Sequence, residues 1–198
     1  MNLILFFNGW GMSSQIFSNF LPLNNYQIEI LSYPYDTSEI DFGKYNHIYI
    51  VGWSFGVYYA SSFLDKFTLK NYTAIAINGT PEIIGKNGIT PGIFDLTLNT
   101  LDKKNLSKFY NNMEVSDNFL SPERDIAELK KELEILKNFY HPFPNYFHKV
   151  FVGKRDKIVP TSKQLKYFKD KGIEIIQLDC GHYPFSLLDS WNKIIEDV

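Results

Sequence analysis

The pentapeptide at residues 52–56 has the pattern G-x-S-x-G with Ser54 at its centre, and it constrains the fold more than any other feature. An apolar, β-branched run precedes it at residues 47–51, and the residues after it form a predicted helix. Strand, sharp turn and helix are the context of a nucleophile elbow, in which two glycines allow the close backbone approach that lifts a serine above a sheet edge. The motif alone is weak evidence. In this setting it predicts that Ser54 is a nucleophile.

Strand and helix patterns alternate on both sides of this motif. Apolar runs predict strands at residues 2–7, 26–31, 47–51, 72–77, 149–152 and 173–178. Helices are predicted from Ser13 or Ser14 to residue 20, from the elbow to residue 67, and over residues 161–171 and 185–198. This alternation predicts an α/β fold, with a parallel sheet of about six strands covered by helices on both faces.

The periodicity changes between residues 83 and 147, where no strand is predicted. Ser121 followed by Pro122 has the pattern of an N-cap and a first helical residue, and shorter helices are predicted at residues 93–101 and 103–113. The 198 residues are therefore expected to form a single domain. Its α/β core would comprise residues 1–82 and 148–198. Residues 83–147 would form a helical lid after the fourth strand, at the edge where open α/β sheets place their binding sites.

A serine nucleophile needs a base, and that base needs an orienting carboxylate. In proteins with a nucleophile elbow, the three catalytic residues follow one another along the sequence in the order serine, acid, histidine. Of the four histidines, His47 precedes the serine, and His141 and His148 belong to the end of the insert and the next strand. His182 follows the last predicted strand, on a loop that returns to the carboxyl edge of the sheet. Position and elimination make His182 the predicted base.

Two acids compete for the third role. Asp156 follows the strand at residues 149–152, and Asp179 lies three residues before His182. Asp156 would approach from a neighbouring strand end, which is the usual geometry, so we prefer it. Either carboxylate could instead cap a loop or form a surface ion pair.

Acyl transfer also needs two N–H donors for the negative charge that develops on the substrate oxygen. The residue after the nucleophile, Phe55, is one expected donor. The glycine-rich turn after the first strand, residues 8–11, is the expected source of the other, through the N–H of Trp10. An ordinary glycine turn is the alternative interpretation of this segment.

Composition excludes several other classes of function. A net charge of -2 gives no reason to expect binding to nucleic acid or to a membrane surface, and no metal-ligand spacing or phosphate loop is present. The single cysteine, Cys180, fits a buried position in a protein of the reducing cytoplasm better than a nucleophile. No signal peptide or bilayer-spanning segment is recognised, so we expect a cytoplasmic monomer without cofactor. Aromatic residues at 139–147 could line an acyl pocket, but core packing is the preferred interpretation.

These motifs together resemble the α/β-hydrolase superfamily over essentially the whole chain. More narrowly, the segments F-N-G-W-G-M at residues 7–12 and G-W-S-F-G at residues 52–56 resemble the BioG-type esterases of biotin synthesis. Asn8 stands where the BioH-type enzymes, which perform the same reaction, have a histidine, and it agrees with the BioG branch.

The resemblance implies hydrolysis of the methyl ester of pimeloyl-acyl carrier protein. Ser54 would attack the ester carbonyl after losing its proton to His182, Asp156 would orient the imidazole, and the N–H groups of Trp10 and Phe55 would hold the oxyanion. The acidic carrier protein would be the partner, and basic residues around the lid would be its docking surface, although acidic residues match the basic ones across the insert. The alternatives are a thioesterase or general carboxylesterase of the same fold, a lyase using the same residues, and a binding protein without catalysis.

Overall fold

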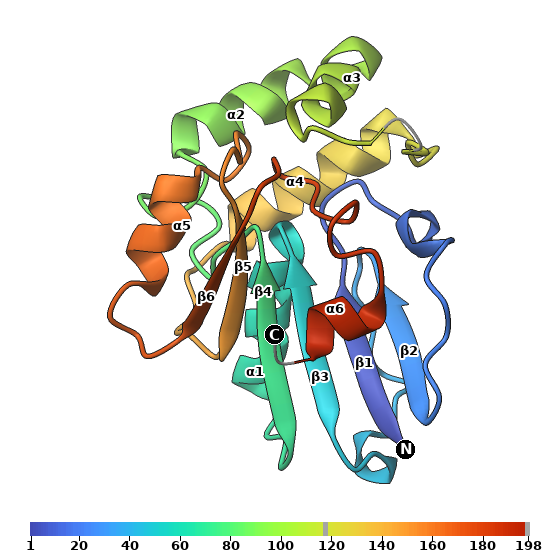
Figure 1. Cartoon of the computed structure of the whole chain (residues 1–198). Coiled ribbons are helices and arrows are strands. Elements are labelled where there is room, and N and C mark those ends of the chain that lie inside the picture. Colours follow the sequence, from blue (N-terminus) through green and yellow to red (C-terminus); the bar gives the residue numbers. More distant parts are fainter. Residues whose placement is uncertain (117–118, 197–198) are drawn as a thin grey trace.

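A six-stranded parallel sheet forms the centre of the computed structural model, which describes residues 1–116 and 119–196. The strand order is β2-β1-β3-β4-β5-β6 (Figure 1). The strands are β1 (Asn2–Phe7), β2 (Tyr26–Leu31), β3 (Ile48–Trp53), β4 (Tyr72–Ile77), β5 (Lys149–Gly153) and β6 (Glu174–Leu178). The predicted bounds of β1, β2 and β4 are confirmed, whereas β3 extends two residues further, to Trp53.

The register brings all carboxyl ends of the strands to one edge. Phe7 pairs with Gly52, and Trp53 with Ile77. At the other side of the sheet, Gly153 pairs with Leu178. Segments that leave β1, β3, β5 and β6 therefore start close together, although they are far apart in the sequence.

Each face of the sheet buries its own apolar layer. Along β1 the side chains alternate, so that Ile4 and Phe6 belong to one layer, and Leu3, Leu5 and Phe7 to the other. All five are at most 1% exposed. A strand buried on both faces reads as a continuous apolar run, which is why β1 was recognisable in the sequence.

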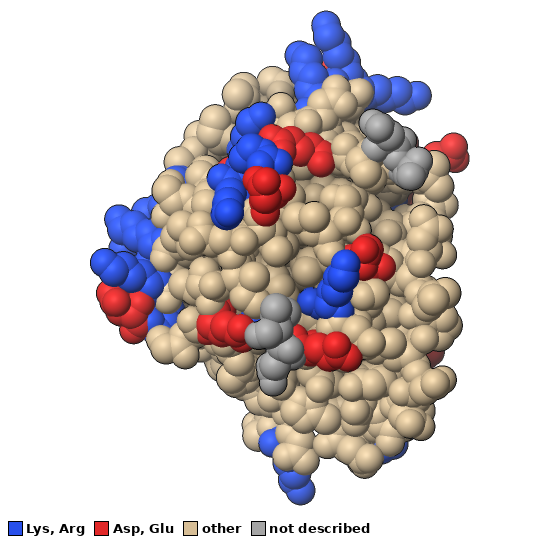
Figure 2. Space-filling model, in the orientation of Figure 1, with Lys and Arg blue, Asp and Glu red and all other residues tan. Residues whose placement is uncertain are grey.

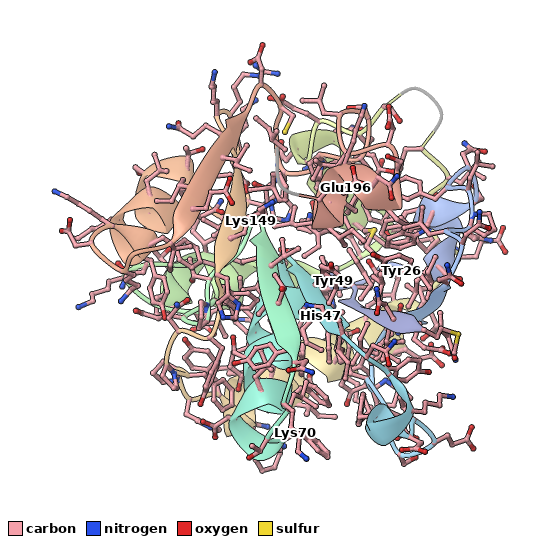
Figure 3. The ribbon with its side chains drawn as sticks, turned by 60° about the horizontal axis from the view of Figure 1, so that its bottom comes forward. Tyr26, His47, Tyr49, Lys70, Lys149 and Glu196 are labelled. Carbon is pink, nitrogen blue, oxygen red and sulfur yellow. The ribbon has the colours of Figure 1, made fainter. Side chains whose placement is uncertain are left out.

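Helices cover both faces, as predicted. The helices α1 (Phe55–Lys66) and α5 (Thr161–Phe168) pack on one face, and α6 (Trp191–Ile195) packs on the other (Figure 1). Lys149 Nζ donates a hydrogen bond to the carbonyl oxygen of Glu196 at 2.8 Å, which ties the segment after α6 to the start of β5 (Figure 3).

The helices of the insert, residues 83–147, lie beyond the carboxyl ends of the strands (Figure 1). They are α2 (Pro91–Thr100), α3 (Lys103–Asn112) and α4 (Ile126–Phe139). Trp10, in the loop after β1, donates a hydrogen bond from its ring Nε1 to the carbonyl oxygen of Leu129 on α4 at 3.1 Å. The insert is thus joined directly to the loop where the second N–H donor is expected.

Three predicted helices are wrong in extent. Only the 3-10 turn η1 (Ser14–Phe17) forms where a helix to residue 20 was expected. The helix α4 starts after Asp125, whose Oδ1 accepts hydrogen bonds from the Ala127 and Glu128 N–H groups, and not at Pro122. The last helix is confined to α6, and residues 197–198 of its predicted range lie outside the described residues. In α4 and in the last helix, the helix starts at a capping side chain that lies further along the chain than the predicted start.

Candidate active site

Ser54 occupies the sharp turn between β3 and α1. Its backbone has φ 56° and ψ -121°, a left-handed conformation that non-glycine residues rarely adopt. The turn is held by hydrogen bonds from the Ser54 N–H to the Ile77 carbonyl oxygen at 2.9 Å and from the Val57 N–H to the Ser54 carbonyl oxygen at 3.0 Å. A Cβ on Gly52 would lie 2.7 Å from the Gly56 carbonyl oxygen, and one on Gly56 would overlap the Phe7 carbonyl. Both glycines are therefore required sterically.

A continuous chain of hydrogen bonds connects Ser54, His182 and Asp156. His182 Nε2 lies 2.8 Å from Ser54 Oγ, and His182 Nδ1 lies 2.8 Å from Asp156 Oδ2. All three residues are at most 5% exposed. The three segments that carry them follow β3, β5 and β6, so the common carboxyl edge brings them together. This arrangement can transfer a proton from a serine hydroxyl to an imidazole whose other nitrogen faces a carboxylate.

Asp156 is held by several hydrogen bonds, whereas Asp179 lies on the surface. Oδ1 of Asp156 accepts hydrogen bonds from the Ile158 and Val159 N–H groups at 2.9 and 3.0 Å. Oδ2 accepts a further bond from Gln164 Nε2 at 2.9 Å. The side chain of Asp179 is 77% exposed and pairs with Arg155. The structure therefore brings Asp156, and not Asp179, to His182.

Gln164 was not singled out from the sequence. It is fully buried on α5 and contacts the same carboxylate oxygen as His182. A polar residue on the inward face of the helix predicted over residues 161–171 was the available signal. Such a residue needs an internal partner, because an unpaired buried amide costs about 1–3 kcal/mol.

The remaining histidines and the cysteine lie elsewhere or are unreactive. His47 is next to Tyr49 at the amino end of the sheet (Figure 3), with Nε2 2.9 Å from Thr73 Oγ1. His148 Nδ1 accepts a hydrogen bond from the Ala74 N–H at 3.0 Å, and His141 is exposed. Burial raises the pKa of the Cys180 thiol to about 11, and the charge of Asp156 acts in the same direction. This favours the unreactive thiol form.

The segments that carry Trp10 and Phe55 both lie beside Ser54, because a Cβ on Gly9 would lie 3.3 Å from Ser54 Cβ and Phe55 follows Ser54 directly. Phe55 is the first residue of α1, so its N–H is among the four that no helical carbonyl accepts. In the turn after β1, the Gly9 N–H donates to Asn8 Oδ1 at 3.0 Å and the Met12 N–H to the Gly9 carbonyl oxygen at 3.2 Å. The side chain of Asn8 thus shapes the turn that carries Trp10.

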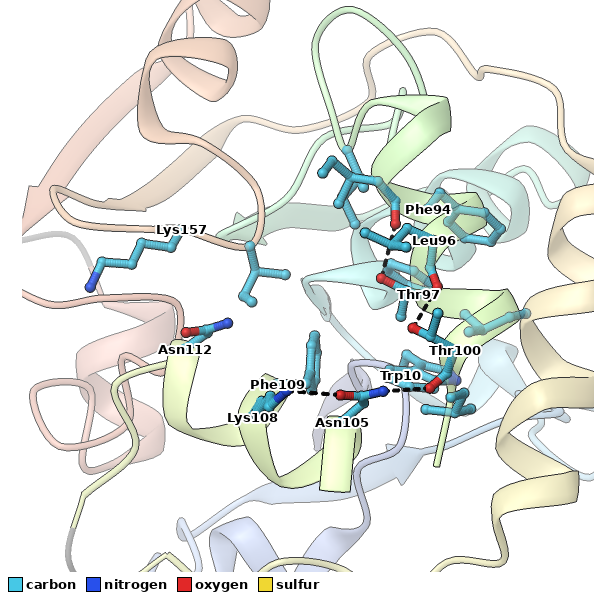
Figure 4. A pocket seen from close by; sticks show the side chains of 16 residues that line it. Trp10, Phe94, Leu96, Thr97, Thr100, Asn105, Lys108, Phe109, Asn112 and Lys157 are labelled. Atoms are coloured by element: carbon cyan, nitrogen blue, oxygen red, sulfur yellow. Dashed lines mark hydrogen bonds between the residues drawn. The ribbon is translucent and has the colours of Figure 1, made fainter. Parts of the chain in front are cut away.

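A pocket of about 310 Å³ opens between α2 and α3 and reaches the site at Trp10 and Phe55 (Figure 4). Its lining is mainly apolar, with polar groups and two lysines, Lys108 and Lys157. The lining residues are Trp10, Phe55, Ile89, Ile93, Phe94, Leu96, Thr97, Thr100, Leu101, Asn105, Lys108, Phe109, Asn112, Leu133, Lys157 and Ile158.

The aromatic residues at 139–147 do not line this pocket. Phe143 and Phe147 are buried in the core, as the preferred interpretation expected, while Phe139 is 74% exposed. Most of the pocket lining comes instead from α2 and α3, which were predicted as parts of the lid but not as pocket walls.

Within residues 1–116 and 119–196, no group of three or more His, Cys, Asp or Glu side chains could hold a metal ion. None of the helices in these ranges combines the length and apolar character that a bilayer crossing requires.

Known structures share this fold. A lipase-esterase related protein from Clostridium acetobutylicum is 17% identical over 93% of this chain and 88% of its own, with a TM-score of 0.61. An epoxide hydrolase from Bacillus megaterium is 14% identical over 93% of this chain and 88% of its own, with a TM-score of 0.59. The chain thus has the α/β-hydrolase fold, as predicted.

More similar proteins narrow this assignment. BioG from Haemophilus influenzae has a crystal structure with a TM-score of 0.85 to this chain, and it is 27% identical over 98% of this chain and 94% of its own. A malonyl-[acyl-carrier protein] O-methyltransferase from Bacteroides fragilis (strain 638R) is 35% identical over 93% of this chain, which spans only 40% of that protein. The family model described as pimeloyl-ACP methyl esterase BioG matches residues 1–194. With that match over nearly its whole length, the chain belongs to the BioG family.

Proposed function

We propose that this protein is a serine esterase in which Ser54 is the nucleophile, His182 the general base and Asp156 the orienting acid. The observation that carries the proposal is the hydrogen-bonded series from Ser54 Oγ through both ring nitrogens of His182 to Asp156 Oδ2, with 2.8 Å at each step. Its position beside an apolar pocket supports an acyl substrate.

The reaction proceeds in two halves. His182 Nε2 takes the proton of Ser54 Oγ as the oxygen attacks the ester carbonyl, and the imidazolium is stabilised by Asp156. The bond to the methoxy group breaks, and His182 returns the proton so that methanol leaves. Water, activated by the same imidazole, then attacks the acyl-Ser54 ester and releases the free carboxylate. During both attacks the N–H groups of Trp10 and Phe55 hold the negative charge of the carbonyl oxygen.

The proposed substrate is the methyl ester of pimeloyl-acyl carrier protein. Membership of the BioG family supports it, and the apolar lining contributed by Phe94, Leu101 and Leu133 suits a chain of methylene groups. Burying such a chain contributes about 0.8 kcal/mol per methylene group. This favours a dicarboxylate chain over a short acyl group.

The insert is proposed to act as a lid on a core of residues 1–82 and 148–198. Its helices α2 and α3 form pocket walls beside Trp10 and Phe55, and their separation would set the access of substrate to Ser54. Lysine side chains project from the top of the molecule over α3, where Lys103, Lys104 and Lys108 lie (Figure 2). An acidic carrier protein would dock there, with its acyl chain entering between α2 and α3. Electrostatic steering of this kind mainly raises the association rate.

The name of the Bacteroides relative describes methyl transfer, which is the opposite operation on a related acyl group. This chain spans 40% of that protein. The Ser54–His182–Asp156 series provides a nucleophile and a base for hydrolysis, so we assign this chain the removal of a methyl group and not its addition.

Single-turnover mass spectrometry tests the proposal. Purified protein is mixed with pimeloyl-acyl carrier protein methyl ester, and wild type is compared with Ser54→Ala. The matched control is Ser61→Ala, which removes a buried hydroxyl that donates to the Val57 carbonyl oxygen at 2.8 Å on the same helix. The proposal predicts loss of one CH₂ from the carrier protein with wild type and Ser61→Ala, and no change with Ser54→Ala.

Other mass changes would identify other activities. Loss of the whole acyl chain would show a thioesterase. Gain of a CH₂ by malonyl-acyl carrier protein in the presence of a methyl donor would show a methyltransferase. An unchanged carrier protein, together with cleavage of a simple ester, would retain the serine hydrolase and discard this substrate.

A further inference from the structure

A buried asparagine outside the triad directly follows the strand between the nucleophile and the acid. β4 lies between β3, which precedes Ser54, and β5, which precedes Asp156. Asn78 follows the last residue of β4, and it is fully buried with φ 47°. Its backbone N–H donates to the Phe151 carbonyl oxygen on β5 at 3.0 Å.

The side chain of Asn78 bridges the two segments that carry the acid and the base. Its Oδ1 accepts a hydrogen bond from the N–H of Gly153, the last residue of β5, at 2.6 Å. Its Nδ2 donates to the carbonyl oxygens of His182 at 2.9 Å and Gly181 at 3.2 Å. A backbone N–H can only donate and a carbonyl oxygen can only accept, so these partners allow a single orientation of the amide.

A second buried donor contacts the carbonyl oxygen of His182. Trp53 Nε1 donates to the His182 carbonyl oxygen at 3.0 Å, so that oxygen accepts bonds from both Trp53 and Asn78. Trp53 immediately precedes Ser54. The backbone of the base is thus fixed to the strand of the nucleophile by one bond, and to the strand of the acid through the amide of Asn78.

We propose that Asn78 is a positioning residue, which holds the His182 and Asp156 segments at the separation that both 2.8 Å contacts of the imidazole require. The inference rests on the triad proposed above. Displacement of a catalytic group by about 1 Å can lower the rate about 100-fold. Three hydrogen bonds from one rigid, buried amide oppose such a displacement. They act on the backbone and leave the imidazole itself free to exchange its proton.

The left-handed backbone offers a second explanation for an asparagine at residue 78, because asparagine is favoured at positive φ. The variant Asn78→Gly distinguishes this explanation from the positioning role. Glycine accepts the backbone conformation but has none of the three side-chain bonds. If positioning is the role, kcat for a p-nitrophenyl ester falls about 10–100-fold in Asn78→Gly with little change in KM, and fluorophosphonate labelling of Ser54 slows in parallel. If only the backbone conformation matters, Asn78→Gly keeps the wild-type kcat.

Two more variants separate an effect on kcat from an effect on folding stability. Thr80→Val removes a buried hydrogen bond two residues further on, from Thr80 Oγ1 to the Asn87 carbonyl oxygen at 3.3 Å. It is expected to lower thermal stability and to retain kcat. Asn78→Asp keeps the acceptor for the Gly153 N–H but loses the amide donors, and it is expected to lose kcat although it preserves the side-chain size.

A spectroscopic measurement distinguishes positioning from lost stability. The proton between His182 Nδ1 and Asp156 Oδ2 gives a low-field ¹H resonance while it is protected from exchange. We expect this resonance to broaden or vanish in folded Asn78→Gly and Asn78→Asp, and to persist in Thr80→Val. A wild-type kcat and an unchanged resonance in either Asn78 variant would overturn the inference. Labelling of Ser54→Ala at the wild-type rate would instead refute the triad, and failure of the pimeloyl substrate alone would leave this test intact.

Discussion

Glu132 on α4 is a buried carboxyl group for which replacement should raise stability. Its side chain is 1% exposed, and neither oxygen has a hydrogen-bond partner within residues 1–116 and 119–196. Arg124 Nη2 lies 3.8 Å from Oε2. Burial raises the pKa of Glu132 from 4.5 to about 7, against the opposing effect of the Arg124 guanidinium. Burial, and then the charge of this carboxylate, raise the pKa of Tyr35 and Tyr59 as well.

The sign of the pH dependence follows from the direction of the shift. A carboxyl with a raised pKa in the folded state binds its proton more tightly there than in the unfolded chain. Stability is therefore highest below the unfolded pKa of 4.5 and falls as the pH rises through about 7. A difference of about 2.5 pKa units corresponds to roughly 3 kcal/mol at 1.36 kcal/mol per unit. Above pH ~8 the folded protein carries this full cost.

Glu132→Gln removes the charge and keeps the shape. The variant is expected to match the wild type near pH 4.5 and to exceed its stability by up to about 3 kcal/mol near pH 8, which is about 6–12 °C in Tm for a domain of this size. Thermal unfolding followed by circular dichroism across this range measures it. Glu134→Gln, an exposed neighbour on α4, is the control and should have no such effect. Equal Tm shifts at both pH values, or a less stable Glu132→Gln at pH ~8, would refute the reasoning.

Three further variants test other parts of the structure. Gly56→Ala places a Cβ against the Phe7 carbonyl and should lower the free energy of unfolding by about 3 kcal/mol or more in a urea titration; a stable, active variant would contradict the elbow geometry. Leu101→Trp fills the pocket and should raise KM at least about tenfold for a long acyl ester but not for an acetate ester; equal effects on both would remove the pocket from acyl binding. Lys104→Glu on α3 should raise KM about 3–10-fold for a carrier-protein substrate at low salt and much less at high salt; unchanged KM at low salt would place docking elsewhere.

The sheet and the nucleophile turn could be predicted because their signals are local. Each strand is a short apolar run, and the burial of β1 on both faces leaves no polar position in Leu3–Phe7 to confuse the pattern. Ser54 is recognised by the two glycines beside it, because the crowding at Gly52 and Gly56 arises from the turn itself. Helix starts were predicted less well, since Asp125 competes with Ser121 and only one of them meets free N–H groups.

The site beyond Ser54 depends on contacts between distant segments. The sequence favoured Asp156 over Asp179 only through its place after a neighbouring strand, and the choice is made by the arrangement of β5 and β6, which turns Asp156 inward and leaves Asp179 on the surface. The side chain of Asn78 bonds only to backbone groups, which every residue has, and Gln164 reaches Asp156 and the Val159 carbonyl oxygen from a separate helix, so neither residue belongs to a recognisable motif. The pocket could not be predicted from the sequence either, because it lies between α2 and α3 and its shape depends on how the two helices are placed.

The strand order has a consequence for how this site fails. Ser54 follows β3 in the fully packed middle of the sheet, whereas His182 follows β6, an edge strand in which Glu174, Ile175 and Gln177 are exposed. Edge strands with few buried contacts open locally at lower free energy than the core. Once the bonds from Trp53 and Asn78 to the His182 carbonyl oxygen also break, mild heat or denaturant should displace His182, the proposed base, while β3 before Ser54 is still paired. Loss of esterase turnover would then precede loss of secondary structure, and turnover would return when β6 pairs with β5 again.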